Sequence, residues 1–149
     1  MRDIRVQHPL AIDPSGAMNA IWSGAEWDAR WDAIRSFDVR YDDGVHQIAR
    51  IVLDWSGDDV AMDVVRFRTD ANRIDFFCPN PPRPLSYQSG SWGVESVDGE
   101  CVLVAARRIA LDPALPESGD AHRERLETYA GQLEARLSRI LERFARGPG

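Results

Sequence analysis

The sequence predicts a single α+β domain over residues 1–149, in which a seven-stranded curved antiparallel sheet surrounds a long C-terminal helix. Three observations predict this arrangement. Short turns join most of the strand-like segments, which favours antiparallel pairing. Two short helical segments follow the first strand, and the chain ends in a long amphipathic helix. One helix can cover much of a sheet that bends around it, and the two short helices leave room for an apolar cavity between them.

The first strand is predicted by apolar residues that alternate with polar or small ones, which gives the strand one buried face. These residues are Ile4, Val6, His8, Leu10 and Ile12. A short helix is expected from Asp13, a favourable N-cap, and Pro14, which suits the first helical position, as far as Trp22. A second helix is expected over Ala25–Ile34, because three apolar residues share helical spacing. These three are Trp27, Trp31 and Ile34.

Six more strands are predicted from β-forming residues bounded by turn signals. They span Ser36–Tyr41, Val45–Trp55, Val60–Arg68, Arg73–Cys78, Ser86–Ser96 and Cys101–Leu111. Asp98-Gly99 is a strong hairpin signal between the last two strands. The proline-rich segment Pro79–Pro84 cannot donate regular ladder hydrogen bonds, so it is expected to cross one end of the sheet.

The final helix has the clearest pattern in the sequence. Its apolar residues recur at alternating gaps of four and three, with arginine and glutamate on the other face. They are Leu126, Ala130, Leu133, Leu137, Ile140 and Phe144.

Composition excludes several classes of function. The net charge is −6, and all 18 basic residues are arginines, so general nucleic-acid binding is disfavoured and lysine-dependent chemistry is excluded. The three histidines are scattered, so neither a metal site nor any other cofactor is expected. Cys78 and Cys101 are expected to be small buried hydrophobes. No apolar run is long enough to span a bilayer and no signal peptide is visible, so a cytoplasmic protein is expected.

Arg66 is the sharpest candidate for chemistry. If Val60, Met62 and Val64 face inward, strand alternation brings Arg66 to the same face, and Arg68 follows two residues later. An arginine at the end of an apolar face suits an anionic or carbonyl-bearing ligand. In the alternative register, Ala61, Val65 and Phe67 face inward and both arginines lie in solvent.

Three other side chains could act on protons or line a cavity. Tyr129 lies on the buried side of the final helix, where a cavity would open. Tyr41 is expected to pack in the core with its hydroxyl at the rim. His8 lies on the apolar face of the first strand, where it is either a hydrogen-bonded core residue or a proton-transfer group.

The five tryptophans are numerous for this length, and each is either a core residue or a flat wall for an aromatic ligand. Trp92 is the preferred cavity residue, because Gly90 and Gly93 leave room beside its ring.

The order of elements resembles the helix-grip fold of the START-like and Bet v 1-like superfamily, and within it the bacterial aromatic polyketide aromatase/cyclases. Three stretches carry the resemblance: Glu26-Trp27 with Trp31, Val64-Val65-Arg66 on a central strand, and Pro81–Pro84 followed by Gly90-Ser91-Trp92. Two positions differ from that family, since Val64 replaces a serine and Ile34 a tyrosine.

The resemblance implies an enzyme that directs aldol cyclisation and dehydration of a poly-β-ketone presented on an acyl carrier protein, with no cofactor. It implies catalytic roles for Arg66, Tyr129 and His8. The expected substrate-binding residues are Trp27, Trp31, Met62, Val64, Trp92, Arg68 and Tyr41. The alternative is a carrier that binds a lipid, quinone or aromatic metabolite without changing it, which the two replaced positions favour. No nucleic-acid partner and no membrane span are expected.

Overall fold

The computed structural model of the chain contains one seven-stranded antiparallel sheet in the order β1-β7-β6-β5-β4-β3-β2. It describes residues 1–55, 57–116 and 119–147, without the side chain of Thr69. The strands are β1 (Arg2–Pro9), β2 (Ile34–Asp42), β3 (His46–Trp55), β4 (Asp58–Asp70), β5 (Arg73–Phe77), β6 (Leu85–Val97) and β7 (Glu100–Leu111). The predicted α+β class is confirmed, and β1 pairs with β7, so the first strand lies beside the last.

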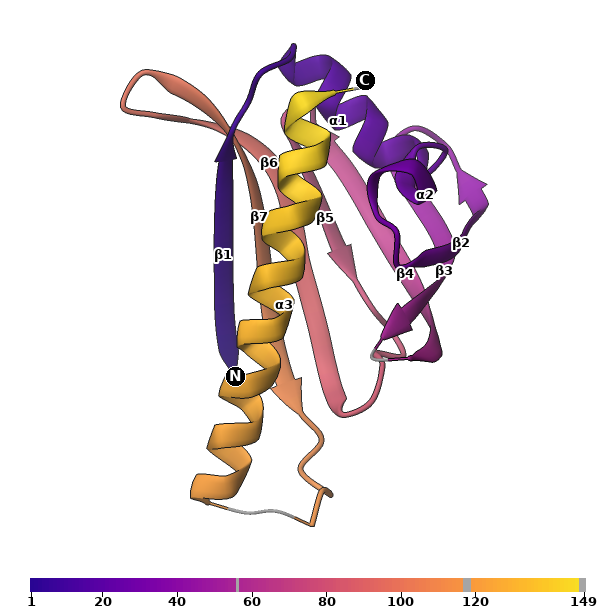
Figure 1. The fold of residues 1–149 in the computed structure, drawn as a ribbon. Helices are drawn as coiled ribbons and strands as arrows, with labels where there is room; N and C mark the ends of the chain where they lie inside the picture. Colours follow the sequence, from indigo (N-terminus) through magenta and orange to yellow (C-terminus); the bar gives the residue numbers. More distant parts are fainter. Residues whose placement is uncertain (56, 117–118, 148–149) are drawn as a thin grey trace.

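The long helix α3 (Asp120–Arg146) lies across one face of the curved sheet (Figure 1). Its apolar residues are buried with the predicted spacing, because one stripe of the helix faces the sheet. The buried residues are Tyr129, Ala130, Leu133, Leu137, Ile140, Leu141, Phe144 and Ala145. The helix begins six residues before the first apolar residue of the pattern, since its first turn is polar and exposed.

The two short helices α1 (Pro14–Ser23) and α2 (Trp27–Arg30) lie near the C-terminal end of α3 (Figure 1). Asp13 caps α1 as predicted, and its carboxylate accepts a 3.2 Å hydrogen bond from the Gly16 amide. Gly24 ends α1 in a left-handed conformation with φ 76°. A Cβ atom there would lie 2.6 Å from the Phe37 ring, so this position requires glycine for both reasons.

The C-terminal end of α3 is attached to the segments around α1 and α2. The Ala11 amide donates a 3.0 Å hydrogen bond to the Ala145 carbonyl oxygen. Arg30 donates from Nη1 to the carbonyl oxygens of Arg143, at 3.2 Å, and Gly147. Arg143 in turn pairs with Asp32 at 3.0 Å. These contacts join segments more than 110 positions apart in the sequence.

The predicted second helix is too long. Only Trp27–Arg30 is helical, Trp31 is extended with φ −140° and ψ 109°, and Ile34 is the first residue of β2. The physical reason is that Ile34 pairs with Leu53 of β3, so sheet formation overrides the helical spacing of these apolar residues. The first strand is also shorter than predicted, because it ends at Pro9 and leaves Leu10 and Ile12 beyond the ladder.

Within the described ranges, no helix combines the length and apolar character needed to cross a membrane. The same residues contain no cluster of three or more histidine, cysteine, aspartate or glutamate side chains that could hold a metal ion.

Candidate functional site

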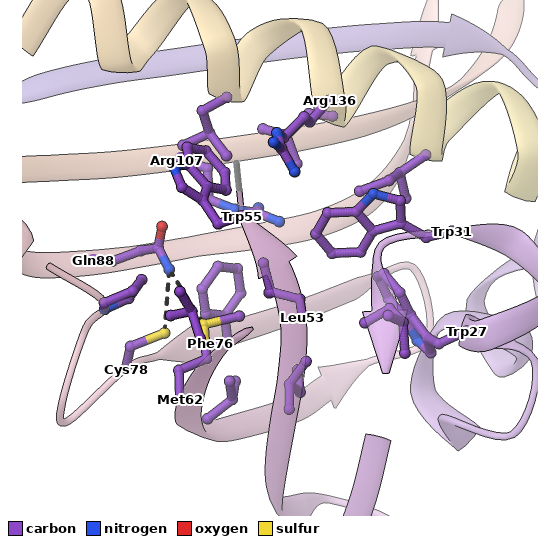
Figure 2. A pocket seen from close by; sticks show the side chains of 18 of the residues that line it. Trp27, Trp31, Leu53, Trp55, Met62, Phe76, Cys78, Gln88, Arg107 and Arg136 are labelled. Carbon is purple, nitrogen blue, oxygen red and sulfur yellow. Dashed lines mark hydrogen bonds between the residues drawn. The ribbon is translucent and has the colours of Figure 1, made fainter. Parts of the chain in front are cut away.

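A cavity lies between the concave face of the sheet, α3 and the Trp27–Trp31 segment (Figure 2). The space open to the centre of a water-sized sphere is about 90 Å³, enough for several water molecules. Most of the lining is aliphatic or aromatic. The apolar lining residues are Trp27, Trp31, Ile34, Phe37, Ile51, Leu53, Trp55, Val60, Met62, Val64, Phe76, Pro82, Trp92, Leu133, Leu137 and Ile140.

The exposure of side chains along β4 shows which end of the cavity opens to solvent. Val60 and Met62 are half-buried, whereas Val64 and Arg66 farther along the same face are 5% and 2% exposed. The other partly exposed lining residues include Trp55 at the end of β3 and Arg136 on α3. The mouth of the cavity therefore lies near Val60, Trp55 and Arg136, and its deep end lies near Arg66.

Aromatic rings form one wall at the deep end. Trp27 is at the centre of this group, with ring centroids 5.3 Å from Trp92, 4.8 Å from Phe144 and 5.7 Å from Phe37. Its indole nitrogen donates a 2.9 Å hydrogen bond to the Ile21 carbonyl oxygen, so the buried polar atom of this ring is satisfied. The wall is held by α1, α2, the sheet and α3 together.

Arg66 lies on the inward face of β4, the first of the two registers that the alternation allowed. Its guanidinium donates from Nη2 to the Ile21 carbonyl oxygen at 2.6 Å and from Nη1 to that of Trp22 at 3.0 Å. Nη1 also donates to Gln47 Oε1 at 2.6 Å. The last carbonyl groups of a helix have no partner within the helix, so Arg66 caps the C-terminus of α1. Burial lowers the pKa of Arg66 to about 9, and the group remains protonated at neutral pH.

A second buried guanidinium belongs to Arg107 of β7, which is 8% exposed. Its central carbon lies 4.4 Å from the Phe76 ring centroid and 4.5 Å from that of Trp92. Nη1 donates to the Ala106 carbonyl oxygen at 2.7 Å and to that of Ser91 at 3.4 Å. Burial lowers the pKa of Arg107 to about 9 as well. Unlike Arg66, this arginine caps no helix.

Tyr129 and Arg136 face each other across Trp55 near the mouth. The Tyr129 ring stacks on the Trp55 ring at a centroid distance of 5.0 Å, and the Arg136 guanidinium lies 4.0 Å from the Trp55 centroid. Arg136 also donates to the Asp54 carbonyl oxygen at 3.3 Å. Burial raises the pKa of the Tyr129 phenol to about 12, so this hydroxyl is a neutral hydrogen-bond donor at physiological pH.

The charge of the cavity is opposite to that of the whole protein. Its lining includes four arginines (Arg66, Arg83, Arg107 and Arg136) and no aspartate, glutamate or histidine among the described residues. Its other polar groups include the Tyr129 hydroxyl, Gln88 and Cys78, and Gln88 Nε2 lies 3.4 Å from Cys78 Sγ (Figure 2). A site of this kind suits an apolar ligand with oxygens that carry negative charge.

The structure brings most of the predicted site residues together around this cavity. Those in the lining are Arg66, Tyr129, Trp27, Trp31, Met62, Val64 and Trp92. Gly90 leaves room near Trp92, as predicted, but this room is occupied by the side chains of Arg107 and Phe76. A Cβ atom at Gly90 would lie 3.0 Å from Arg107 Cδ and 2.9 Å from the Phe76 ring.

Three predicted site residues lie outside the lining in the part of the chain that the structure describes. His8 is half-exposed on the edge strand β1 and its Nδ1 lies 2.8 Å from the Pro9 carbonyl oxygen. Arg68 lies beyond the deep end, two residues past Arg66. Tyr41 is 51% exposed and its hydroxyl donates to Asp43 at 3.0 Å. The prediction for Tyr41 is wrong because the register of β2 shifts between Val39 and Tyr41, which turns its side chain to the outer face.

Sequence reasoning missed Arg107, Arg136, Gln88 and Cys78 as lining residues. The expectation of two buried cysteines is confirmed for Cys78 and wrong for Cys101, which is exposed. The signal for Arg107 was available, because it alternates in β7 with Leu103, Ala105 and Ile109 just as Arg66 alternates in β4. Arg136 lies three residues after Leu133 and therefore near the apolar stripe of α3. The signal for Gln88 was available too, because it lies four residues before Trp92 and therefore on the same face of β6.

No protein-family model matches the chain, and no curated protein matches it in sequence. Its fold is similar to several solved structures. The Zhui aromatase/cyclase from Streptomyces sp. R1128 aligns with a TM-score of 0.80 at 15% identity, over 97% of this chain and 94% of that chain. The di-domain aromatase/cyclase BexL from the BE-7585A biosynthetic pathway aligns with a TM-score of 0.79 at 17% identity, over 97% of this chain and 48% of that one.

A START superfamily protein from Mycobacterium smegmatis aligns with a TM-score of 0.69 at 12% identity, over 94% of this chain and 97% of that chain. The chain therefore has the START-like, Bet v 1-like helix-grip fold, in which a curved sheet surrounds a long C-terminal helix. Among proteins of this fold, its structural neighbours include polyketide aromatase/cyclases.

Proposed function

We propose that this protein is a polyketide aromatase/cyclase, which directs aldol cyclisation and dehydration of a poly-β-ketone carried by an acyl carrier protein. The observation that carries the proposal is the lining of the cavity, which joins indole walls to guanidinium groups and one neutral phenol, with no carboxylate from the part of the chain that the structure describes. Poly-β-ketones are apolar chains with regularly spaced carbonyl groups, and their enolates are anionic. The similarity in fold to the two aromatase/cyclases supports the same activity.

The proposed chemistry follows from these side chains. Loss of a proton from a methylene between two carbonyl groups gives an enolate, whose carbon attacks a ketone carbon and leaves an alkoxide. The Arg107 guanidinium beside the aromatic wall stabilises the enolate. Among the described residues the lining offers no carboxylate or imidazole base, so an ordered water molecule accepts the methylene proton and passes it to the alkoxide, to which the Tyr129 phenol donates a hydrogen bond. Loss of water then gives the aromatic ring.

Binding requires the mouth to widen. Ligand pockets have volumes of roughly 300–1,000 Å³, and the space available here is much smaller. The half-exposed side chains of Trp31, Met62 and Arg136 are those that a substrate displaces first, because fewer neighbours hold them. The rigid deep end then determines which carbons of the folded chain meet.

The test is reconstitution with a minimal polyketide synthase and its carrier protein, followed by chromatography of the products. The wild-type protein is expected to convert the spontaneous mixture into one dominant product. Tyr129→Phe keeps the ring on Trp55 and removes the hydroxyl, so it should slow dehydration by about tenfold or more. Tyr87→Phe, on the outer side of β6 against Phe77, is the matched control. A product mixture that is the same with and without the wild-type protein contradicts the proposal.

A second candidate function is supported by one specific observation. Arg66 is engaged by α1, and the described lining residues include no carboxylate or imidazole base, which suits a carrier that binds a hydrophobic ligand without changing it. Extraction of the protein purified from its native host, followed by mass spectrometry, separates the two functions. A carrier releases a stoichiometric, unaltered metabolite and leaves polyketide product profiles unchanged.

A further inference from the structure

One edge of the Arg107 guanidinium has no hydrogen-bond partner among the described residues. Its hydrogen bonds to the Ala106 and Ser91 carbonyl oxygens both use Nη1. Among residues 1–55, 57–116 and 119–147, no side chain or carbonyl group accepts a hydrogen bond from its Nε or Nη2. The side chain is more than nine-tenths buried, so bulk water does not satisfy these donors freely.

The surroundings of Arg107 compensate its charge only in part. The Phe76 and Trp92 rings attract a cation, but they offer no lone pair to an N–H group. The Arg66 guanidinium repels that of Arg107, and the Cys78 thiol that acts on it is kept neutral because burial raises the pKa of this thiol. A buried cation without an anion is unfavourable, so an anionic ligand group would gain from this position.

The local backbone holds the guanidinium in place. Gly90 is the strand partner of Arg107, and its lack of a side chain lets Arg107 Cδ and the Phe76 ring pass. Gln88, two residues earlier on β6, is 6% exposed and uses its amide nitrogen on Cys78 and Met62. Its Oε1 accepts no hydrogen bond from the described residues, so a ligand hydroxyl could donate to it.

We propose that Arg107 binds an oxyanion of the ligand, a carboxylate or an enolate, through the edge formed by Nε and Nη2. The cavity then selects apolar ligands that carry an anionic oxygen at the end that enters first, and Arg66 serves the fold. This inference deepens the proposed function, since the oxyanion is the enolate of that substrate. Two parallel N–H groups match two oxygens, or one delocalised oxyanion, better than an ammonium group does.

Direct binding tests this without any catalysis. Two oxyanions, 2-naphthoate and the enolate of 4-hydroxycoumarin, are compared with their neutral counterparts 2-naphthamide and coumarin by quenching of tryptophan fluorescence. The wild-type protein is expected to bind at least one of the anions about tenfold more tightly than its neutral counterpart. Which anion is preferred distinguishes carboxylate from enolate recognition. Equal affinities for both pairs overturn the inference.

The variants locate the effect. Arg107→Met should abolish the preference for anions while neutral probes still bind, and Arg107→Lys should reduce it by several-fold because lysine lacks the planar edge. Arg108→Met is the matched control, since Arg108 is the next residue and pairs with Asp3 in solvent.

If circular dichroism shows that Arg107→Met does not fold, Arg107→Lys carries the test, and an undiminished preference for anions in Arg107→Lys overturns edge binding. Arg107-dependent binding together with unchanged polyketide products would keep this inference and refute the cyclase function.

Discussion

Arg66 Nη2 lies 2.6 Å from the Ile21 carbonyl oxygen, in the last turn of α1. A side chain from β4, in the middle of the sheet, thereby caps the C-terminus of α1 at a residue 45 positions earlier in the chain. The arginine that sequence reasoning placed in the chemistry is, by its contacts, first a support for one wall of the cavity.

Replacement of Arg66 by methionine should therefore lower stability. The change leaves Gln47 Oε1 without a donor among the described residues. The Ile21 and Trp22 carbonyl groups each lose one hydrogen bond but keep those from Trp27 Nε1 and Gln47 Nε2. One unsatisfied buried acceptor costs about 1–3 kcal/mol, so we expect a loss of about 1–3 kcal/mol in the free energy of unfolding. Urea denaturation followed by circular dichroism measures it. Arg73→Met, at an exposed pair with Asp75, is the control, and equal stability of the two variants would refute the capping role.

The Tyr129 phenol should make the protein sensitive to alkali. Its pKa is raised from 10.0 to about 12 by burial, so its contribution to stability is complete below about pH 10 and is lost as the pH rises through about 12. The loss amounts to about 2–3 kcal/mol. Absorbance of tyrosinate against pH should lose the Tyr129 step in Tyr129→Phe and keep that of Tyr41, whose pKa is raised by its hydrogen bond to Asp43. If the titration curve of this variant loses an early group instead, the phenol is not buried as described.

Two glycine-to-alanine changes should have opposite signs. At Gly90 the new Cβ would lie 2.2 Å from the Ala106 carbonyl oxygen, a backbone atom that cannot move alone. We expect a loss of about 1–3 kcal/mol in stability. At Gly131, exposed within α3, a Cβ atom meets nothing within 4 Å, and alanine should add about 0.5–1 kcal/mol. Thermal unfolding of both variants tests this, and a stabilised Gly90→Ala would contradict the close approach of β6 and β7.

Leu137 and Leu141 provide a matched pair for the cavity. Both are almost fully buried on α3, but only Leu137 is among the lining residues. Truncation of either to alanine should cost about 2–5 kcal/mol. Leu137→Ala should also improve binding of ligands larger than naphthalene relative to small ones, whereas Leu141→Ala should not. Isothermal titration with a graded series of polycyclic probes measures the difference, and identical size profiles would show that α3 does not shape the site.

The fold was predictable because its strongest signals are local. The alternation in β4 and the spacing in α3 each predict which face of the element is buried. The burial seen in the structure agrees with both predictions. The α2 region was mispredicted because Ile34 pairs with Leu53, a long-range contact that local spacing does not report. Tyr41 was misplaced because a single register shift in β2 exchanges the two faces of the strand.

The site was predictable only in part. The tryptophans and Arg66 follow from pattern and resemblance, whereas the function of Arg66 depends on where α1 ends in space. Arg107 follows from the same alternation that identified Arg66, but its environment is set by Gly90 and Phe76 on two other strands. Strand alternation in the sequence therefore indicates which arginines can face inward. Only the three-dimensional packing shows that Arg107 has N–H groups with no acceptor among the described residues.

The unequal attachment of α3 has a mechanical consequence. Its last turns are tied to Ala11, Arg30 and Asp32, whereas the ion pair between Arg2 and Glu127 near its start is exposed to solvent. We therefore expect any tilt of α3 to pivot near Phe144 and to displace Tyr129 and Arg136 more than the C-terminal turns. We expect amide hydrogen exchange to become steadily slower from Leu126 toward Phe144. Ligands then enter beside the N-terminal part of α3, whereas the attached C-terminal part keeps its conformation.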